Sequence, residues 1–151
     1  MGRILCLDYG HKRIGVSISD PLRITAQPLD TWTGLGPTAL VQKLRIVVAK
    51  ESVDTIVVGL PLTLGGRKGR LAESVERVAE RIRADIPVAV RLWDERLSSV
   101  QAERILRQQN RHPSRCKSTV DRLAAVLVLQ SYLDYLGSPA FRKPEGPVEP
   151  S

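Results

Sequence analysis

The order of apolar and polar residues predicts three short strands at the start of the chain. Residues 4–7 are apolar without interruption, which is typical of a strand buried on both faces of a sheet. Residues 14–19 alternate with period two, and this predicts a strand with one covered face. Because only a short turn containing Gly10 separates these segments, we expect them to form a hairpin. Residues 24–29 have a weaker strand pattern, and Pro28 favours a position at the edge of the sheet.

The rest of the chain predicts alternating helices and strands. A helix begins at Pro37, and its apolar face consists of Leu40, Leu44, Val47 and Val48. Further strands are expected at residues 55–58 and 88–92. Further helices are expected at about residues 70–84, 98–109 and 119–136.

This order of elements predicts one α/β domain over residues 1–136. Three antiparallel strands followed by αβ crossovers give a mixed five-stranded sheet with helices on both faces. Residues 137–151 contain four prolines in fifteen positions, and we expect them to form a disordered tail.

Composition indicates a soluble domain. The chain has 151 residues, of which 42% are hydrophobic and 26% charged, and it is long enough to bury a core. No apolar run approaches the roughly 20 residues that cross a bilayer, and no secretory signal is recognised. We therefore expect a cytoplasmic protein that does not bind membranes. Two cysteines, Cys6 and Cys116, are too few for a zinc site, and Cys6 is expected to be buried.

The charge distribution indicates a polyanionic partner. The formal net charge is +7, and residues 96–122 hold seven cations against two acids. A local excess of this size is typical of surfaces that bind the phosphate backbone of nucleic acids. Trp93 has no aromatic neighbour in the sequence suited to base stacking, so we interpret it as a packing residue. The cations expected to contact nucleic acid are Lys12, Arg13, Arg67, Lys68, Arg96, Arg111, Arg115 and Lys117.

Several acids occupy positions where an apolar or neutral residue would cost less free energy. Asp8 ends the first strand, and Asp94 and Glu95 follow the last one. Asp121 opens the final helix on the stripe that includes Ala125 and faces the core. Because ligands collect outside the carboxyl ends of strands in open α/β sheets, we expect these acids to lie close together.

Carboxylates gathered in this way favour a divalent metal site. Repulsion between them is relieved by a raised pKa on one acid or by a bound cation. Oxygen ligands suit Mg²⁺ or Mn²⁺, and two such ions about 4 Å apart can support phosphodiester hydrolysis. Simpler roles stay open for single acids: Asp121 could complement the dipole of its helix, and Glu95 could pair with a surface arginine.

Four segments, in order and spacing, resemble the YqgF/RuvX family: LCLDYGHKRIGVSISD, VVGLPLTLGGRKG, WDERLSS and STVDRLAAVLVLQSYLD. The resemblance covers about residues 3–136. It implies an RNase H-like fold, and members are described as Holliday junction resolvases and as nucleases that mature the 5′ end of 16S rRNA. The expected partner is therefore branched DNA or precursor rRNA.

The resemblance also implies roles for individual acids. Asp8 matches the acid of the first strand, Glu95 the acid of the DER motif, and Asp121 the acid of the last helix. These three are expected to be the catalytic metal ligands, with Asp94 as the alternative ligand after the last strand. Related resolvases have a carboxylate on the strand that here reads VVGLP, which has none.

Two other functions stay open from the sequence. An acid and a glycine after an apolar strand also resemble the phosphate loop of actin-like ATPases, which need two such domains to enclose ATP; ATP binding would identify one. A nucleic-acid-binding module without catalysis would use the same cations, and metal-dependent cleavage would exclude it. The protein could be a monomer or a homodimer, since symmetrical cutting of a junction favours a two-fold dimer.

Overall fold

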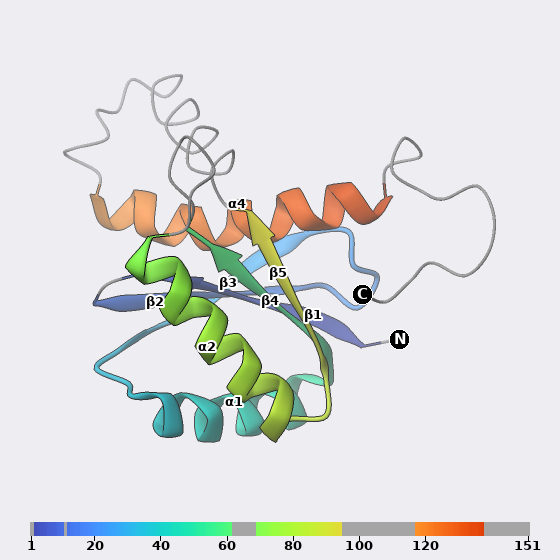
Figure 1. Ribbon diagram of the computed structural model, residues 1–151. Helices are drawn as coiled ribbons and strands as arrows, with labels where there is room; N and C mark the ends of the chain where they lie inside the picture. Colours follow the sequence, from blue (N-terminus) through green and yellow to red (C-terminus); the bar gives the residue numbers. More distant parts are fainter. Residues whose placement is uncertain (1, 11, 62–68, 95–116, 138–151) are drawn as a thin grey trace.

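The computed structural model describes residues 2–10, 12–61, 69–94 and 117–137, and for residues 117–123 the backbone alone. Its centre is a five-stranded sheet in the order β3-β2-β1-β4-β5 (Figure 1). The β1–β2 and β2–β3 pairs are antiparallel, and the β1–β4 and β4–β5 pairs are parallel. This arrangement confirms the predicted mixed sheet. The strands are β1 (Arg3–Tyr9), β2 (Arg13–Ser19), β3 (Ala26–Thr33), β4 (Val53–Leu60) and β5 (Ala89–Asp94).

The strand β3 differs most from its predicted range. It begins at residue 26 rather than 24, and it continues to residue 33 rather than 29. The late start follows from the Asp20 carboxylate, which holds the preceding segment in a turn by accepting hydrogen bonds from the amides of Leu22, Ile24 and Thr25. The bond from Thr25, followed by the others, keeps the pKa of Asp20 below its ordinary value. As Pro28 predicts, β3 is an edge strand of the sheet.

Helices cover both faces of the sheet, as predicted. Figure 1 shows α1 (Pro37–Glu51) and α2 (Arg70–Asp85) against one face, and α4 (Lys117–Gly137) crossing the other. None of the helices in the described ranges is long and apolar enough to cross a membrane. The helix predicted at residues 98–109 lies outside the described residues, and so does the predicted tail after Gly137, the last residue of α4.

Two hydrophobic cores lie on opposite faces of the sheet. Leu5 and Leu7 of β1 belong to the core beneath α1 and α2, whereas Ile4 and Cys6 belong to the core beneath α4. All four side chains are fully buried, which explains why the apolar run has no polar gap and confirms the burial of Cys6. Because side chains alternate along a strand, this division also fixes the face to which the next residues of β1 point.

Polar contacts fix α4 along β2 and β3. The Ser17 hydroxyl on β2 donates a 2.8 Å hydrogen bond to the backbone carbonyl of Ala125. Farther along the helix, the Gln130 side chain accepts a 3.0 Å bond from the amide of Ala26 and donates a 2.9 Å bond to the carbonyl of Ile24. These bonds set the position of the helix along the strands, which apolar packing alone specifies less strictly.

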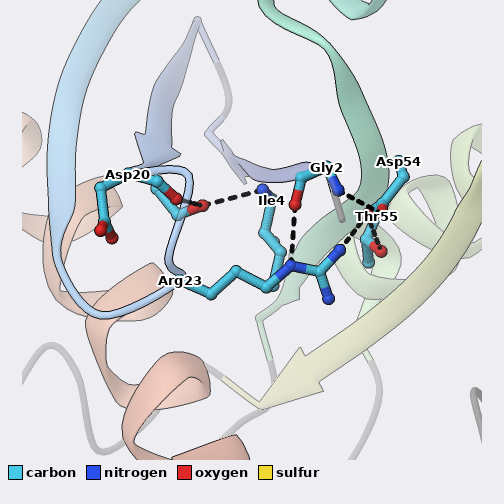
Figure 2. Close-up of polar contacts among 7 residues, drawn as sticks. Gly2, Ile4, Asp20, Arg23, Asp54 and Thr55 are labelled. Carbon is cyan, nitrogen blue, oxygen red and sulfur yellow. Dashed lines mark hydrogen bonds and ion pairs between the residues drawn. The ribbon is translucent and has the colours of Figure 1, made fainter.

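Arg23 anchors the start of β1 (Figure 2). This end of the strand lies far from Asp8, which is near the carboxyl end of β1. Its Nε donates a 2.8 Å hydrogen bond to the carbonyl of Gly2, and its guanidinium pairs with the Asp54 carboxylate. That carboxylate also accepts 2.9 Å bonds from the Gly2 amide and the Thr55 hydroxyl. Burial would raise the pKa of Asp54, but the bonds from Gly2 and Thr55 and the charge of Arg23 keep the pKa below its ordinary value.

Candidate functional site

The carboxyl ends of β1, β4 and β5 meet at one edge of the sheet, since these strands are parallel. Asp8 of β1 lies opposite Gly59 of β4, and Gly59 lies opposite Trp93 of β5. The three residues therefore form one row across the sheet, close to this edge. Strands are spaced about 4.8 Å apart, so Asp8 and Trp93 stand roughly 10 Å apart along the row.

Asp8 points to the face of the sheet that α4 covers. Ile4 and Cys6, the preceding residues with the same parity on β1, pack in the core beneath α4. Asp8 is partly buried, whereas the four residues before it are buried completely. A carboxylate in this position combines reduced solvation with access to a ligand at the edge, as an acid of a metal or catalytic site requires.

Trp93 and Asp94, the last two residues of β5, point to opposite faces. Trp93 packs in the core beneath α4, so it shares the face of Asp8. Asp94 and Val90 are an even number of residues apart on β5, so their side chains point to the same face, and Val90 belongs to the core beneath α1 and α2. Asp94 also lies opposite Leu60 of β4, which packs against that same core. Asp94 therefore points away from the face that Asp8 occupies.

The two other predicted site acids are placed only in part. Asp121 lies in the first half of α4, one helical turn before Ala125, whose carbonyl is bonded to Ser17 of β2. Ser17 lies opposite Cys6 of β1, two residues before Asp8, so the helix passes over the same part of the sheet. For Asp121 the structure describes the backbone and not the side chain. Glu95, which follows β5 in the sequence, lies outside the described residues.

The donor set for a metal can therefore be tested only for Asp8 and Asp94. Among the residues whose side chains are described, no three His, Cys, Asp or Glu residues form a group that could hold a metal ion. The Asp8 carboxylate is a hard oxygen ligand of the kind that Mg²⁺ and Mn²⁺ prefer, and a metal bound there would need further ligands from outside this set.

An aromatic cluster lies beside the row of Asp8, Gly59 and Trp93. Trp93 meets Tyr132 with ring centroids 5.2 Å apart and Tyr135 with centroids 5.0 Å apart. Burial raises the pKa of the Tyr132 phenol, against the opposing charge of Arg91. The packing role predicted for Trp93 is confirmed, but its aromatic neighbours, which come from α4, were missed. Their separation of about 40 residues in sequence leaves no local signal.

Two of the predicted nucleic-acid contacts can be placed with their side chains. Lys12 and Arg13 are exposed where β1 turns into β2, next to the end of the strand that carries Asp8. Lys117 is the first residue of α4, and the structure describes its backbone but not its side chain. The remaining predicted contacts lie outside the described residues: Arg67, Lys68, Arg96, Arg111 and Arg115.

Solved structures with a similar fold include two complexes with a Holliday junction. The chain aligns with Thermus thermophilus RuvC in complex with a Holliday junction substrate at a TM-score of 0.56 and 13% identity, covering 91% of this chain and 96% of that one. It aligns with Fowlpox virus resolvase at a TM-score of 0.54 and 11% identity, covering 89% and 98%. With the order of strands in the sheet, these likenesses show that the domain has an RNase H-like fold.

Sequence relatives give the family within this class. A family model described as RuvX, Holliday junction resolvase, matches residues 2–135. The chain is 41% identical over 136 residues to a protein of Koribacter versatilis, covering 90% of this chain and 89% of the relative. It is 43% identical over 135 residues to a protein of Geobacillus kaustophilus, covering 87% and 97%. Both relatives are named "Putative pre-16S rRNA nuclease". The chain belongs to the RuvX family, which confirms the resemblance of its four motifs and makes it a nuclease, a hydrolase of phosphodiester bonds.

Proposed function

We propose that this nuclease is a divalent-metal-dependent endonuclease that cuts structured nucleic acid at the carboxyl edge of β1, β4 and β5. The position of Asp8 carries the proposal, because this acid lies one residue before the end of the central strand, on the face that α4 covers. Asp121 belongs to α4, and Glu95 directly follows β5 in the sequence, so both acids would lie near the same edge.

We infer that Asp8, Glu95 and Asp121 hold Mg²⁺ or Mn²⁺. Bound there, such ions would activate a water molecule and stabilise the leaving oxygen of the cleaved phosphodiester. The direction of Asp94, toward the face of α1 and α2, supports Glu95 rather than Asp94 as the ligand after β5. The Glu95 carboxylate, directly after β5, would also replace the one that β4 lacks, since β4 has Gly59 opposite Asp8.

Cations around the edge would bind the phosphate backbone. Lys12 and Arg13 extend from the turn between β1 and β2, close to Asp8. Lys117 begins α4, which holds Asp121. We assign the same function to the predicted cations outside the described residues. Backbone contacts of this kind position a substrate without reading its base sequence.

Two substrates follow from the names of the relatives and of the family. Pre-16S rRNA is the substrate in the names of the curated relatives, and a Holliday junction is the substrate in the description of the family model. Both are structured polyanions that suit a basic edge. Trimming an rRNA end in the cytoplasm needs one active site, whereas symmetrical cutting of a junction needs two and would favour a homodimer.

Incubating the purified protein with each substrate distinguishes them. A precursor 16S rRNA fragment with its 5′ extension and a four-way DNA junction are incubated separately, with Mn²⁺ or with EDTA. We expect Mn²⁺-dependent cleavage of at least one substrate and none in EDTA. Cleavage that persists in EDTA would exclude the metal mechanism, and absence of cleavage of both would exclude the proposed substrate class.

A further inference from the structure

A cavity of about 380 Å³ opens at the same edge as Asp8, but on the other face of the sheet. It lies between the turn that joins β1 to β2 and the connection that joins β3 to α1, and it is lined by Tyr9, Lys12, Arg13, Ile14, Trp32 and Leu35, among others. Cavities of 300 Å³ and above are in the range that binds small ligands. The volume therefore suits one nucleotide rather than a duplex.

The floor of the cavity is apolar and comes from three adjacent strands. Tyr9 of β1 lies opposite Ile14 of β2, and Ile14 lies opposite Trp32 of β3, so the three side chains form a row. Ile14 and Trp32 are buried, so Tyr9, which is partly exposed, supplies the accessible aromatic ring of this row. Such a ring can stack on a base.

Trp32, at one end of this floor, is held in place from two sides. Its indole Nε1 donates a 3.0 Å hydrogen bond to the Asp30 carboxylate. The Lys43 ammonium of α1 lies 5.2 Å from the centre of the ring. A floor fixed in this way needs little rearrangement when a ligand enters, which lowers the entropic cost of binding.

The rim of the cavity is cationic. Lys12 and Arg13 are exposed there, and no acidic residue is among the described residues that line it. The turn that presents them is tight, because the Gly10 amide donates a 2.8 Å bond to the Arg13 carbonyl, and a Cβ on Gly10 would lie 2.8 Å from that oxygen. The rim thus offers positive charge for a phosphate beside an aromatic surface for a base.

A second cavity, at the other end of the sheet, lacks this combination. It has a volume of about 310 Å³ and is lined by Arg3, Lys50 and Glu51, with no aromatic residue among its described lining. There Arg3 pairs with Glu51 at 3.6 Å, which offsets its charge. Lys50 therefore provides a matched control, since it is an exposed lysine beside a cavity of similar size.

We propose that the cavity at Tyr9 binds one unpaired nucleotide of the substrate strand, next to the bond that is cut. Its base would lie against Tyr9, which is the partly exposed aromatic residue of the row, and its phosphate would face Lys12 and Arg13. Asp8 and Tyr9 are consecutive, with Cα atoms about 3.8 Å apart and side chains on opposite faces. A strand that crosses this edge would therefore pass from the acidic site directly into the cavity.

The proposal rests on the proposed function, and it adds a selectivity. A base in a duplex is stacked and paired, so it cannot enter a cavity lined by side chains unless it is extruded. The site would therefore favour substrates with an unpaired nucleotide beside the cleavage point, such as a single-stranded 5′ extension. A blunt duplex would bind only through the cationic rim.

The test is a binding measurement in EDTA, so that cleavage plays no part. Fluorescence anisotropy gives the Kd of a labelled RNA hairpin with a five-nucleotide 5′ overhang and of the same hairpin with a blunt end. The variants are Lys12→Ala and Tyr9→Leu, with Lys50→Ala as the control. Circular dichroism confirms that each variant is folded, and Lys12→Ala, at an exposed position, decides the test if Tyr9→Leu is unstable.

We expect the wild-type protein to bind the overhang at least fivefold more tightly than the blunt hairpin, on the order of one stacked base. Tyr9→Leu should reduce this preference toward one, Lys12→Ala should weaken overhang binding severalfold, and Lys50→Ala should change neither. Adenosine 5′-monophosphate should compete with the overhang for the wild-type protein but not for Lys12→Ala.

Equal binding of both hairpins, or equal losses from Lys12→Ala and Lys50→Ala, would overturn the proposal. If the preference holds but Mn²⁺ supports no cleavage, the nuclease mechanism fails while the nucleotide site stands.

Discussion

Trp93 and Ser131 join the end of β5 to α4. The indole Nε1 of Trp93 donates a 2.9 Å hydrogen bond to the Ser131 hydroxyl, which in turn donates a 2.8 Å bond to the carbonyl of Val128. Glu95 lies two residues after Trp93, and Asp121 lies on the helix that holds Ser131. The bond therefore connects α4, which includes Asp121, to the strand that directly precedes Glu95 in the sequence.

Replacing Ser131 with Ala should weaken this connection. The partly buried indole N–H would lose its acceptor, which should lower the free energy of unfolding by about 1 kcal/mol and the Tm by about 3 °C. The control is Ser74→Ala, because Ser74 lies on α2 and its hydroxyl accepts a long 3.4 Å bond from exposed Arg77, well above the 2.9 Å length of the Trp93 bond. Thermal unfolding followed by circular dichroism measures both, and equal melting temperatures for the two variants would contradict the role of the bond.

The assignment of the ligand after β5 predicts different effects for two adjacent acids. Glu95→Gln should lower the cleavage rate about a hundredfold or more, equal to roughly 2.7 kcal/mol of transition-state stabilisation. Asp94→Asn should act mainly on thermal stability, because Asp94 points to the face opposite that of Asp8. Rates at saturating Mn²⁺ decide between them. An inactive Asp94→Asn with an active Glu95→Gln would place the ligand one residue earlier.

The basic residues from Arg111 to Lys117, the first residue of α4, should contribute most of the salt-dependent affinity. Replacing Arg111, Arg115 and Lys117 with Ala should weaken nucleic-acid binding irrespective of sequence, because each cation that binds a phosphate releases counterions. The slope of log K against log salt concentration should become shallower by up to about one unit for each cation removed. A triple variant of Arg45, Lys50 and Arg77, which are exposed cations of α1 and α2, is the control. If only the control flattens the slope, the binding surface lies on the α1 and α2 face.

The Asp54 network should stabilise the fold in a pH-dependent way. Its folded pKa is lowered, so the stabilisation is fully present above the unfolded value near 3.8 and is lost as pH falls through the folded pKa. Asp54→Asn should therefore be less stable than the wild type at pH 6, and the difference should shrink below about pH 4. Urea unfolding at pH 6, 4 and 3 measures it. A difference that stays constant over this range would exclude the charged carboxylate as its source.

Most of the fold could be predicted from local patterns. The apolar runs of β1 and β4 and the proline at the start of α1 each carry their signal within a few residues, and the structure confirms all three. The start of β3 was predicted too early because the bonds to Asp20 shape a turn there, and they depend on the geometry of the turn as well as on its residues.

The site could be predicted only in its outline. Asp8 is conspicuous in the sequence because a charge directly follows a buried run. The face of the sheet to which Asp94 points depends on where β5 ends and on the register of β5 with β4. Neither can be predicted from a pattern of six residues. The cavity at Tyr9 depends on the pairing of three strands, so its lining residues, which are distant in sequence, gave no common signal.

Cleavage by Asp8→Asn tests the metal site most directly. The substitution keeps the size of the side chain but removes the charge that would hold Mg²⁺ or Mn²⁺. We predict that the variant binds the precursor rRNA fragment and the DNA junction with nearly unchanged Kd in EDTA. With Mn²⁺ it should cleave neither substrate, while the wild-type protein cleaves at least one. Mn²⁺-dependent cleavage by Asp8→Asn at the wild-type rate would contradict the proposed site.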